Sequence, residues 1–192
     1  MARPRMARGD RREQLVAVSW SLVRTEGADA LTLGRLAEWA EVSKPVVYSH
    51  FSSRSDLLVA LYDEFDTRQA GALEADLAEA EVTLRGRAEA IARSYVGCVL
   101  RQGRELVGIL AALEGSPELE KLKRESEHAY VERCREVLAP LVDSRSVSWA
   151  TMVAIFGAAE ALSLAAADAA LSAEDATREL ADVIIAVVGN PA

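Results

Sequence analysis

The sequence is poor in the residues that build disulfide frameworks, metal centres and aromatic-rich sheets. Its 192 residues include two cysteines and two histidines, and aromatic residues make up 5%. Two thiols, Cys98 and Cys134, cannot form a disulfide framework or a four-ligand zinc site, so a reducing cytoplasmic compartment is expected. The arginine-bearing N-terminus has no apolar segment after it and therefore does not resemble a secretory signal.

The residue sets on which most enzymes depend are also missing. No glycine-rich phosphate loop and no Ser/His/Asp set is evident. Glu125 and His128 have the Glu-x-x-His spacing of di-iron bundles, but such centres need a second motif and further carboxylates. We therefore expect no catalytic residue, metal or cofactor; a bundle enzyme is the weaker alternative, which metal analysis would test.

What the chain does contain favours helices. Hydrophobic residues make up 51% of it, with abundant alanine, which is the best helix former and a poor strand former. No alternating strand pattern of useful length occurs. The sequence predicts an all-α fold, either as one domain or as a small domain plus a larger one.

Charge is distributed unevenly along the chain. The net charge is −8, yet residues 1–55 hold nine Arg or Lys and six acids, a net of +3, so residues 56–192 carry −11. A basic N-terminal quarter on an acidic body is expected where one small region meets phosphate. Residues 1–9 are expected to form a basic disordered arm, although a solvated tail without a DNA role would look the same.

Helical spacing and end signals divide residues 10–55 into three short helices. The first runs from about Asp10 to Glu26 and ends at Gly27, where a positive φ is easy. Thr32 is expected to cap the second helix. After a turn through residues 41–42, Ser43 is expected to cap a third helix that has Pro45 in its first turn and ends near residues 49–51.

The remaining residues are expected to form a helical domain over 56–192. Candidate caps are Thr83 and Ser172, Pro117 can start a helix after Ser116, and Pro140 can end one. These signals predict helices at 56–80, 84–102, 104–113, 117–139, 146–170 and 173–188.

The second and third helices form a candidate helix-turn-helix at about 32–51. In such a unit one face of each helix is buried, and the second helix enters the major groove. Lys44 can reach a guanine edge or a phosphate, Val46 a thymine methyl, and Tyr48 a phosphate oxygen. The residues expected to bind DNA are Thr32, Ser43, Lys44, Pro45, Val46, Tyr48, Ser49, His50 and Arg54. Spacing alone leaves an ordinary helical hairpin with a solvated polar face as an alternative.

A family resemblance favours the DNA-binding interpretation. Residues 10–60 resemble the DNA-binding domain of TetR-family transcriptional regulators in the pattern Thr32-(x)3-Leu36-Ala37-(x)2-Ala40-(x)-Val42-Ser43-Lys44-(x)2-Val47-Tyr48-(x)2-Phe51-(x)2-Arg54-(x)2-Leu57-Leu58. The resemblance implies a homodimeric, ligand-responsive regulator, most often a repressor, with a helical ligand-binding and dimerisation domain after the helix-turn-helix. It also implies a double-stranded DNA operator, a small-molecule effector and no membrane partner.

Three positions depart from the family pattern. Glu41 stands where glycine is usual, which is tolerable if this residue keeps helical φ. Pro45 replaces a small residue at the start of the third helix. Ser49 and His50 replace the more common His-Tyr or Tyr-His pair, so contacts there are harder to assign. Trp39 lies off the apolar stripe of its helix and is expected to pack.

Small residues on the helix at 146–170 and apolar residues on the last helix predict a dimer interface, because small side chains let another helix approach closely. Internal packing is the alternative. A membrane span over 147–171 is disfavoured by the charges of Glu160 and Asp168. The expected interface residues are Ala150, Ala154, Gly157, Ala158, Ala161, Ala165, Leu180, Ile184 and Val187.

A ligand pocket is expected among the middle helices, where the larger and softer apolar side chains lie. Its candidate residues, which could equally be core, are Phe65, Tyr95, Cys98, Glu114, Tyr130, Cys134, Trp149, Met152 and Phe156. Glu114 or Glu160 could orient a polar or cationic ligand, or each could equally be a satisfied helix carboxylate. The sequence thus predicts a cytoplasmic DNA-binding regulator; the alternative is a helical small-molecule-binding protein that does not use DNA.

Overall fold

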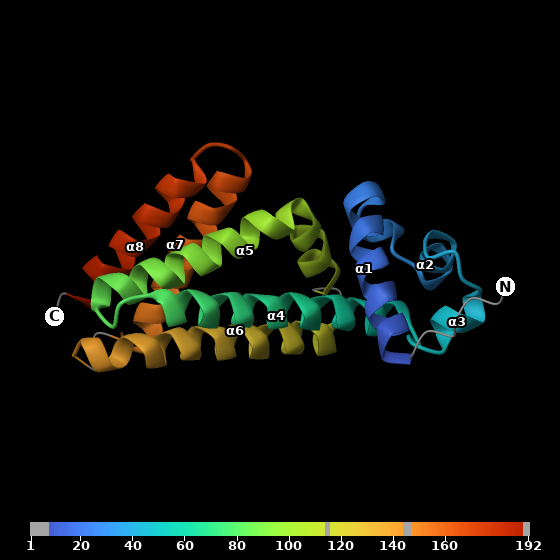
Figure 1. The fold of residues 1–192 in the computed structure, drawn as a ribbon, viewed down its shortest axis with the longest axis horizontal. Coiled ribbons are helices and arrows are strands. Elements are labelled where there is room, and N and C mark those ends of the chain that lie inside the picture. Colours follow the sequence, from blue (N-terminus) through green and yellow to red (C-terminus); the bar gives the residue numbers. More distant parts are fainter. Residues whose placement is uncertain (1–7, 114–115, 144–146, 190–192) are drawn as a thin grey trace. The chain divides into compact units, whose positions relative to one another are not determined.

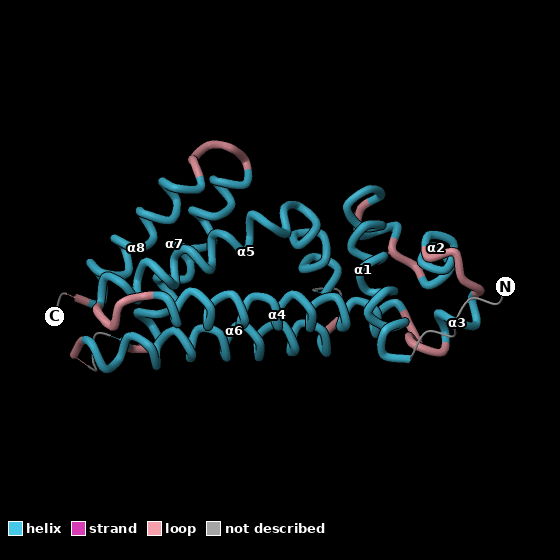
Figure 2. The backbone as a smooth tube through the Cα atoms, viewed as in Figure 1, coloured by secondary structure: helices cyan, strands magenta, loops and turns pink. Residues whose placement is uncertain are grey.

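A computed structural model describes residues 8–113, 116–143 and 147–189 of the chain. All the regular elements within these ranges are helices, with no strand among them, which confirms the predicted all-α class (Figures 1 and 2). Contacts group the chain into two compact units, residues 1–65 with 104–121 and residues 66–103 with 122–192. We call them the first and the second unit.

The first unit contains a small helical domain built on fully buried apolar side chains. Its elements are α1 (Arg8–Glu26), the 3-10 helix η1 (Ala28–Ala30), α2 (Leu33–Trp39), α3 (Lys44–Tyr48) and the beginning of α4 (Arg54–Glu79). Apolar residues recur at helical spacing, so each short helix presents one face to a common core. That core includes Leu15, Leu22, Leu36, Val47, Phe51 and Leu57.

The ends of these helices are fixed by local chemistry, largely as predicted. Gly27 follows α1 with φ 85°, a conformation that costs glycine little. The Thr32 hydroxyl accepts a hydrogen bond from the Arg35 amide at 3.1 Å, so the predicted cap of α2 is confirmed. Ser43 precedes α3 at the capping position, but its side chain makes no capping hydrogen bond.

The turn between α2 and α3 differs from expectation at Glu41. Glu41 has φ 52°, in the left-handed region. It therefore does not keep the helical φ under which a glutamate was expected to be tolerated at this position. The Val42 amide donates to the Ala37 carbonyl at 3.0 Å and the Glu41 amide to the Glu38 carbonyl at 3.2 Å. These two bonds form a Schellman motif, whose left-handed residue is usually glycine. The two hydrogen bonds of the Schellman motif hold Glu41 in the left-handed conformation, which glutamate does not favour.

The second unit is a helical bundle. It contains the later part of α4, much of α5 (Leu84–Leu113) and α6 (Pro117–Leu138), then η2 (Ala139–Leu141), α7 (Trp149–Ala167) and α8 (Ala173–Val188). Its core combines Leu73, Ile91, Cys134, Met152 and Ile184 with other apolar residues of α4 to α8. Helices α7 and α8 pack closely on each other.

Two boundaries in this part of the chain correct the sequence prediction. Helix α5 runs unbroken through Gly103, where two helices were expected, because one glycine costs a helix only about 1 kcal/mol and packing outweighs it. Helix α4 begins at Arg54, and the Ser53 hydroxyl accepts from the Asp56 amide at 3.1 Å. The predicted caps Thr83 and Ser172 are confirmed by their bonds to the amides of Gly86 and Asp175.

Candidate nucleic-acid interface

Helices α2 and α3 form a compact helix-turn-helix. Ala37 and Val47 are buried, with exposed fractions of 2% and 0%, and α2 and α3 make direct contacts. The small Ala37 side chain permits the close crossing, while the Schellman turn sets where α3 starts. The local sequence therefore presents the opposite face of α3 outward.

Six of the nine predicted DNA-binding side chains are exposed. Tyr48 is 56% exposed, which is unusual for an aromatic side chain that only supports a core. Val46 and His50 are half-buried, so they are less accessible than their neighbours. The exposed members of the set are Thr32, Ser43, Lys44, Pro45, Tyr48 and Ser49.

Lys44 lies beside the beginning of α2. A Cβ added to Gly34 would be 3.8 Å from Lys44 Cε, 4.0 Å from Lys44 Nζ and 4.0 Å from Thr32 Oγ1. No ion pair joins Lys44 to another described residue. An uncompensated ammonium is therefore held next to the N-terminus of a helix, and both features attract phosphate.

Arg54 is engaged inside the first unit. Its Nε donates to the Leu31 carbonyl at 2.8 Å and its Nη2 to the Ala28 carbonyl at 2.9 Å. The sequence suggested that Arg54 holds the DNA backbone, whereas the half-buried guanidinium here fastens η1 and the loop before α2 to the start of α4. These two bonds hold the segment that immediately precedes Thr32.

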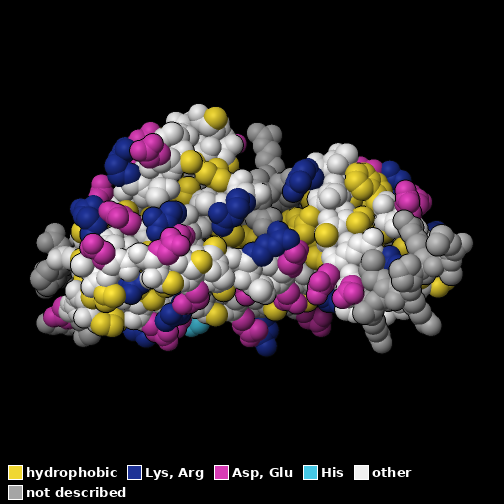
Figure 3. Space-filling view, viewed as in Figure 1, with side chains coloured by type: hydrophobic (Ala, Val, Ile, Leu, Met, Phe, Trp, Pro, Cys, Tyr) yellow, Lys and Arg dark blue, Asp and Glu magenta, His cyan; other side chains and the backbone are white. Residues whose placement is uncertain are grey.

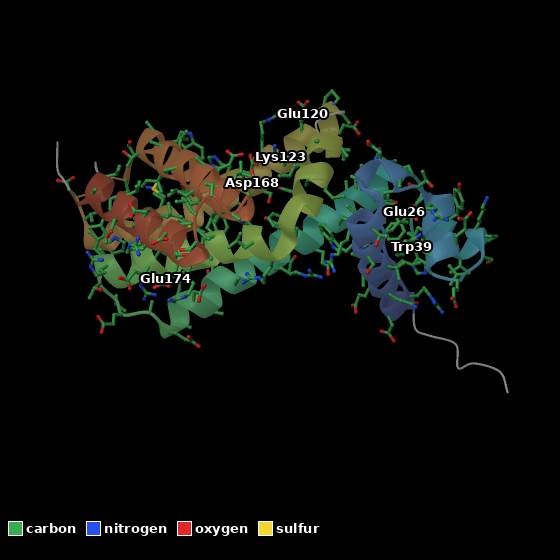
Figure 4. All side chains as sticks on the ribbon, turned by 90° about the horizontal axis from the view of Figure 1, so that it is seen from above. Glu26, Trp39, Glu120, Lys123, Asp168 and Glu174 are labelled. Carbon is green, nitrogen blue, oxygen red and sulfur yellow. The ribbon has the colours of Figure 1, made fainter. Side chains whose placement is uncertain are left out.

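A second network, centred on Glu26, was not anticipated. Glu26 accepts from Arg35 Nε at 2.9 Å, from Arg35 Nη2 at 2.5 Å and from Trp39 Nε1 at 3.1 Å (Figure 4). Arg35 Nη1 also donates to Glu38 at 2.6 Å. The Arg35 hydrogen bonds, followed by that of Trp39, lower the pKa of Glu26, while the carboxylates raise the pKa of Arg35.

The Glu26 network joins the end of α1 to α2. Trp39, which was expected to pack, is half-buried and donates this hydrogen bond to Glu26. The sequence offered only one signal for this network, an acidic residue at the end of one helix and a basic residue near the start of the next. Many exposed residue pairs that make no contact show the same pattern. Because two carboxylates already hold Arg35, this arginine adds less positive charge to the surface than the sequence suggests.

The candidate ligand-binding residues are only partly brought together. The rings of Tyr95, Tyr130 and Phe156 are mutually in contact, with centroid separations of 5.6–6.1 Å. Cys134 and Met152 belong to the same buried core as Tyr130, and Cys98 is also buried. Burial raises the pKa of both thiols, which opposes a thiolate redox role.

Three other members of that list lie elsewhere. Phe65 belongs to the first unit, where its ring packs on Tyr62 at 6.0 Å. Trp149 is 45% exposed and stacks on His128 with centroids 4.3 Å apart, so it is not part of the buried core. Glu114 lies outside the described residues. Sequence reasoning also missed Ser94, whose buried hydroxyl lies in this core.

The candidate dimer residues divide between surface and core. Ala150, Ala154, Gly157, Ala161 and Val187 are exposed, whereas Ala158 and Ala165 are half-buried. The structure corrects the prediction that Leu180 and Ile184 lie at the dimer interface. Both are fully buried within the protomer, because the apolar stripe of α8 faces the bundle. The exposed face of α7 instead includes Val153 and Leu164, at 51% and 42% exposure.

Charges on the second unit largely satisfy one another. Arg133 pairs with Glu74 at 2.7 Å, and Arg93 with Asp76 at 2.9 Å. On the face shown in Figure 3, acidic and basic side chains are interspersed over these helices. Within the described ranges, no group of three or more His, Cys, Asp or Glu side chains could hold a metal ion. The face of this unit that Figure 3 shows therefore carries charges of both signs.

The fold and the outward-facing α3 define a helix-turn-helix protein with an additional helical unit. Residues 15–61 match the model of the family described as bacterial regulatory proteins, tetR family. Residues 15–61 of this chain are therefore similar to the N-terminal domain of the TetR family of regulators.

Solved structures show the same fold over nearly the whole chain. A protein of unknown function from Rhodococcus sp. RHA1 is 24% identical, with a TM-score of 0.81 over 97% of this chain and 100% of that one. A TetR-like transcriptional regulator from the same strain is 19% identical, with a TM-score of 0.76 over 97% and 100%. A TetR-family regulator from Streptomyces coelicolor is 19% identical, with a TM-score of 0.75 over 94% and 95%.

Proposed function

We propose that this protein is a cytoplasmic, ligand-responsive repressor that binds a palindromic DNA operator as a homodimer. The observation that carries the proposal is the exposure of Tyr48 and of the uncompensated Lys44 on the outward side of a family-matched helix-turn-helix. The short α3 carries few other groups that could read bases.

The residues of this interface have different proposed roles. Lys44 binds a phosphate or a guanine edge, and Tyr48 donates to a phosphate oxygen. Thr32, Ser43 and Ser49 offer hydroxyl and backbone groups to the flanking phosphates. Pro45, Val46 and His50 make the contacts by which this chain selects its own operator, and Arg54 acts by positioning Thr32.

A dimer is proposed because α7 leaves an apolar face uncovered. Val153, Gly157 and Leu164 are spaced along one side of the helix, and small residues between them allow close approach. By length and composition α7 would also qualify as a membrane span. We favour a second copy of α7 as the partner, since Glu160 lies within the helix and two-fold symmetry suits a palindromic operator.

A gel shift with DNA from upstream of the protein's own coding sequence tests the DNA interface. Lys44→Ala should weaken binding and reduce the slope of log affinity against log salt by about 0.9, the loss of one phosphate contact. Tyr48→Phe should weaken binding with little change in slope. Lys121→Ala, which removes an exposed lysine from α6, is the matched control. Unchanged affinity and slope for both α3 variants would overturn the contact assignment.

Regulation is proposed to arise from an effector in the second unit. An effector shifts the dimer between two arrangements only to the extent that it binds one of them more tightly. The arrangement that it favours would hold the two α3 helices at a spacing that does not fit the operator. If random-oligonucleotide selection recovers no bound sequence, the protein is instead a small-molecule binder that does not use DNA.

A further inference from the structure

The second unit contains three buried side-chain hydroxyls, those of Ser94, Tyr130 and Ser163, that have no hydrogen-bond partner among the described residues. Ser94 on α5 is 1% exposed and Tyr130 on α6 is 8% exposed. Leaving a buried polar group unsatisfied costs about 1–3 kcal/mol, and native cores contain few such groups. Two of them at one place indicate that a further polar atom belongs there.

Two further aromatic rings contact the ring of Tyr130. Tyr95 follows Ser94 on α5, and its ring centroid is 6.1 Å from that of Tyr130 and 5.6 Å from that of Phe156. Phe156 on α7 meets Tyr130 edge-on at 5.7 Å. Three helices thus contribute flat apolar surfaces beside a pair of polar atoms. This combination of apolar walls and a few convergent polar groups is typical of small-molecule sites.

The surroundings are unfavourable to an ion. No charged side chain is among the buried residues that the structure describes. Burial raises the pKa of Tyr130, Cys134 adds to the rise, and the neighbouring Ser94 hydroxyl opposes it. Arg68 and Arg101 act on Cys98, but both are exposed. An ionised ligand would lose its hydration here without gaining a buried counter-charge.

We propose that the effector is a neutral, mainly aromatic small molecule whose single polar oxygen binds between the hydroxyls of Ser94 and Tyr130. Its apolar part packs against Tyr95 and Phe156. The inference rests on the proposed function, in which the second unit takes an effector, and adds its chemical class. Because a hydroxyl can both donate and accept, one ligand oxygen can satisfy both protein groups.

Three probes that share one ring system test the class. The full-length protein is dialysed to equilibrium against 2-naphthol, 2-methylnaphthalene or 2-naphthoate, which carry a hydroxyl, a methyl group of similar size and a carboxylate. We expect 2-naphthol to bind about tenfold more tightly than 2-methylnaphthalene, since 1.4 kcal/mol corresponds to tenfold and hydrogen bonds contribute on this scale. We expect 2-naphthoate to bind most weakly. Tightest binding by 2-naphthoate, or no binding by any probe, would overturn the proposal.

Single substitutions test which side chains cause the preference for 2-naphthol over 2-methylnaphthalene. Tyr130→Phe and Ser94→Ala should each reduce the ratio between 2-naphthol and 2-methylnaphthalene affinities toward one, while leaving 2-methylnaphthalene binding nearly unchanged. Ser163→Ala is the matched control, because it removes another buried, unpartnered hydroxyl two helical turns from Phe156 on α7. An undiminished ratio in both Tyr130→Phe and Ser94→Ala contradicts the assignment.

The dialysis experiment needs no DNA, so it separates this inference from the proposed function. Loss of operator binding with retained 2-naphthol selectivity would refute only the repressor function. Operator binding together with equal affinities for 2-naphthol and 2-methylnaphthalene would refute only the ligand class.

Discussion

Replacing Glu41 by glycine should stabilise the protein. Glu41 closes the Schellman turn with φ 52°, a conformation that costs a non-glycine residue about 1–2 kcal/mol. Glycine removes this cost but gains freedom in the unfolded chain, which offsets about 0.4–1 kcal/mol. The net gain should be about 0.5–1 kcal/mol. For a chain of this length, that corresponds to a rise in Tm of about 1–4 °C.

Urea unfolding followed by tryptophan fluorescence measures the gain. Trp20 and Trp39 lie in the first unit with Glu41. Ala169→Gly is the matched control in the second unit. Ala169 has φ 58°, and the Ala170 amide donates to the Ala165 carbonyl at 2.9 Å, as the Val42 amide donates to the Ala37 carbonyl in the turn at Glu41. We expect Ala169→Gly to stabilise by a similar amount without changing DNA affinity.

Glu41→Gln separates strain from charge, because glutamine keeps the side-chain volume and the left-handed conformation. It should leave stability nearly unchanged but tighten DNA binding, since it removes an acid next to α3. Glu41→Gly should do both. If Glu41→Gly is no more stable than the native protein while Ala169→Gly is stabilised, the strain argument for the α2–α3 turn is refuted.

Three further perturbations test other contacts. Arg54→Met should lower the free energy of unfolding by about 1–3 kcal/mol in urea, because the Leu31 carbonyl loses its donor and the Ala28 carbonyl keeps only the Leu31 amide; an unchanged value would mean that the Arg54 bonds contribute nothing. The lowered pKa of Glu26 contributes stability above its ordinary pKa of 4.5, and this is lost as pH falls through the lowered value. Glu26→Gln should therefore show a shallower acid decline in Tm, and an identical decline would contradict this. Val153→Glu should yield monomers in sedimentation velocity if α7 is the dimer interface, whereas Val82→Glu, at a 72% exposed residue before α5, should not.

The sequence by itself determined the helical class, most helix ends and the helix-turn-helix frame. These features depend on interactions between residues close in the chain. Thr32 caps α2 through an amide three residues away, and Gly27 ends α1 because it accepts a positive φ. The outward position of Lys44 and Tyr48 likewise follows from helical spacing around the buried Val47.

The tertiary structure decided which group meets which across long stretches of chain. It turned Arg54 inward to the Ala28 carbonyl, linked Glu26 to Trp39, and buried Leu180 within the protomer. Periodicity identifies an apolar face but not the element that covers it, and a charge pattern does not show which partner compensates a charge. Those outcomes depend on the packing of all the helices together, which also placed Ser94 beside Tyr130.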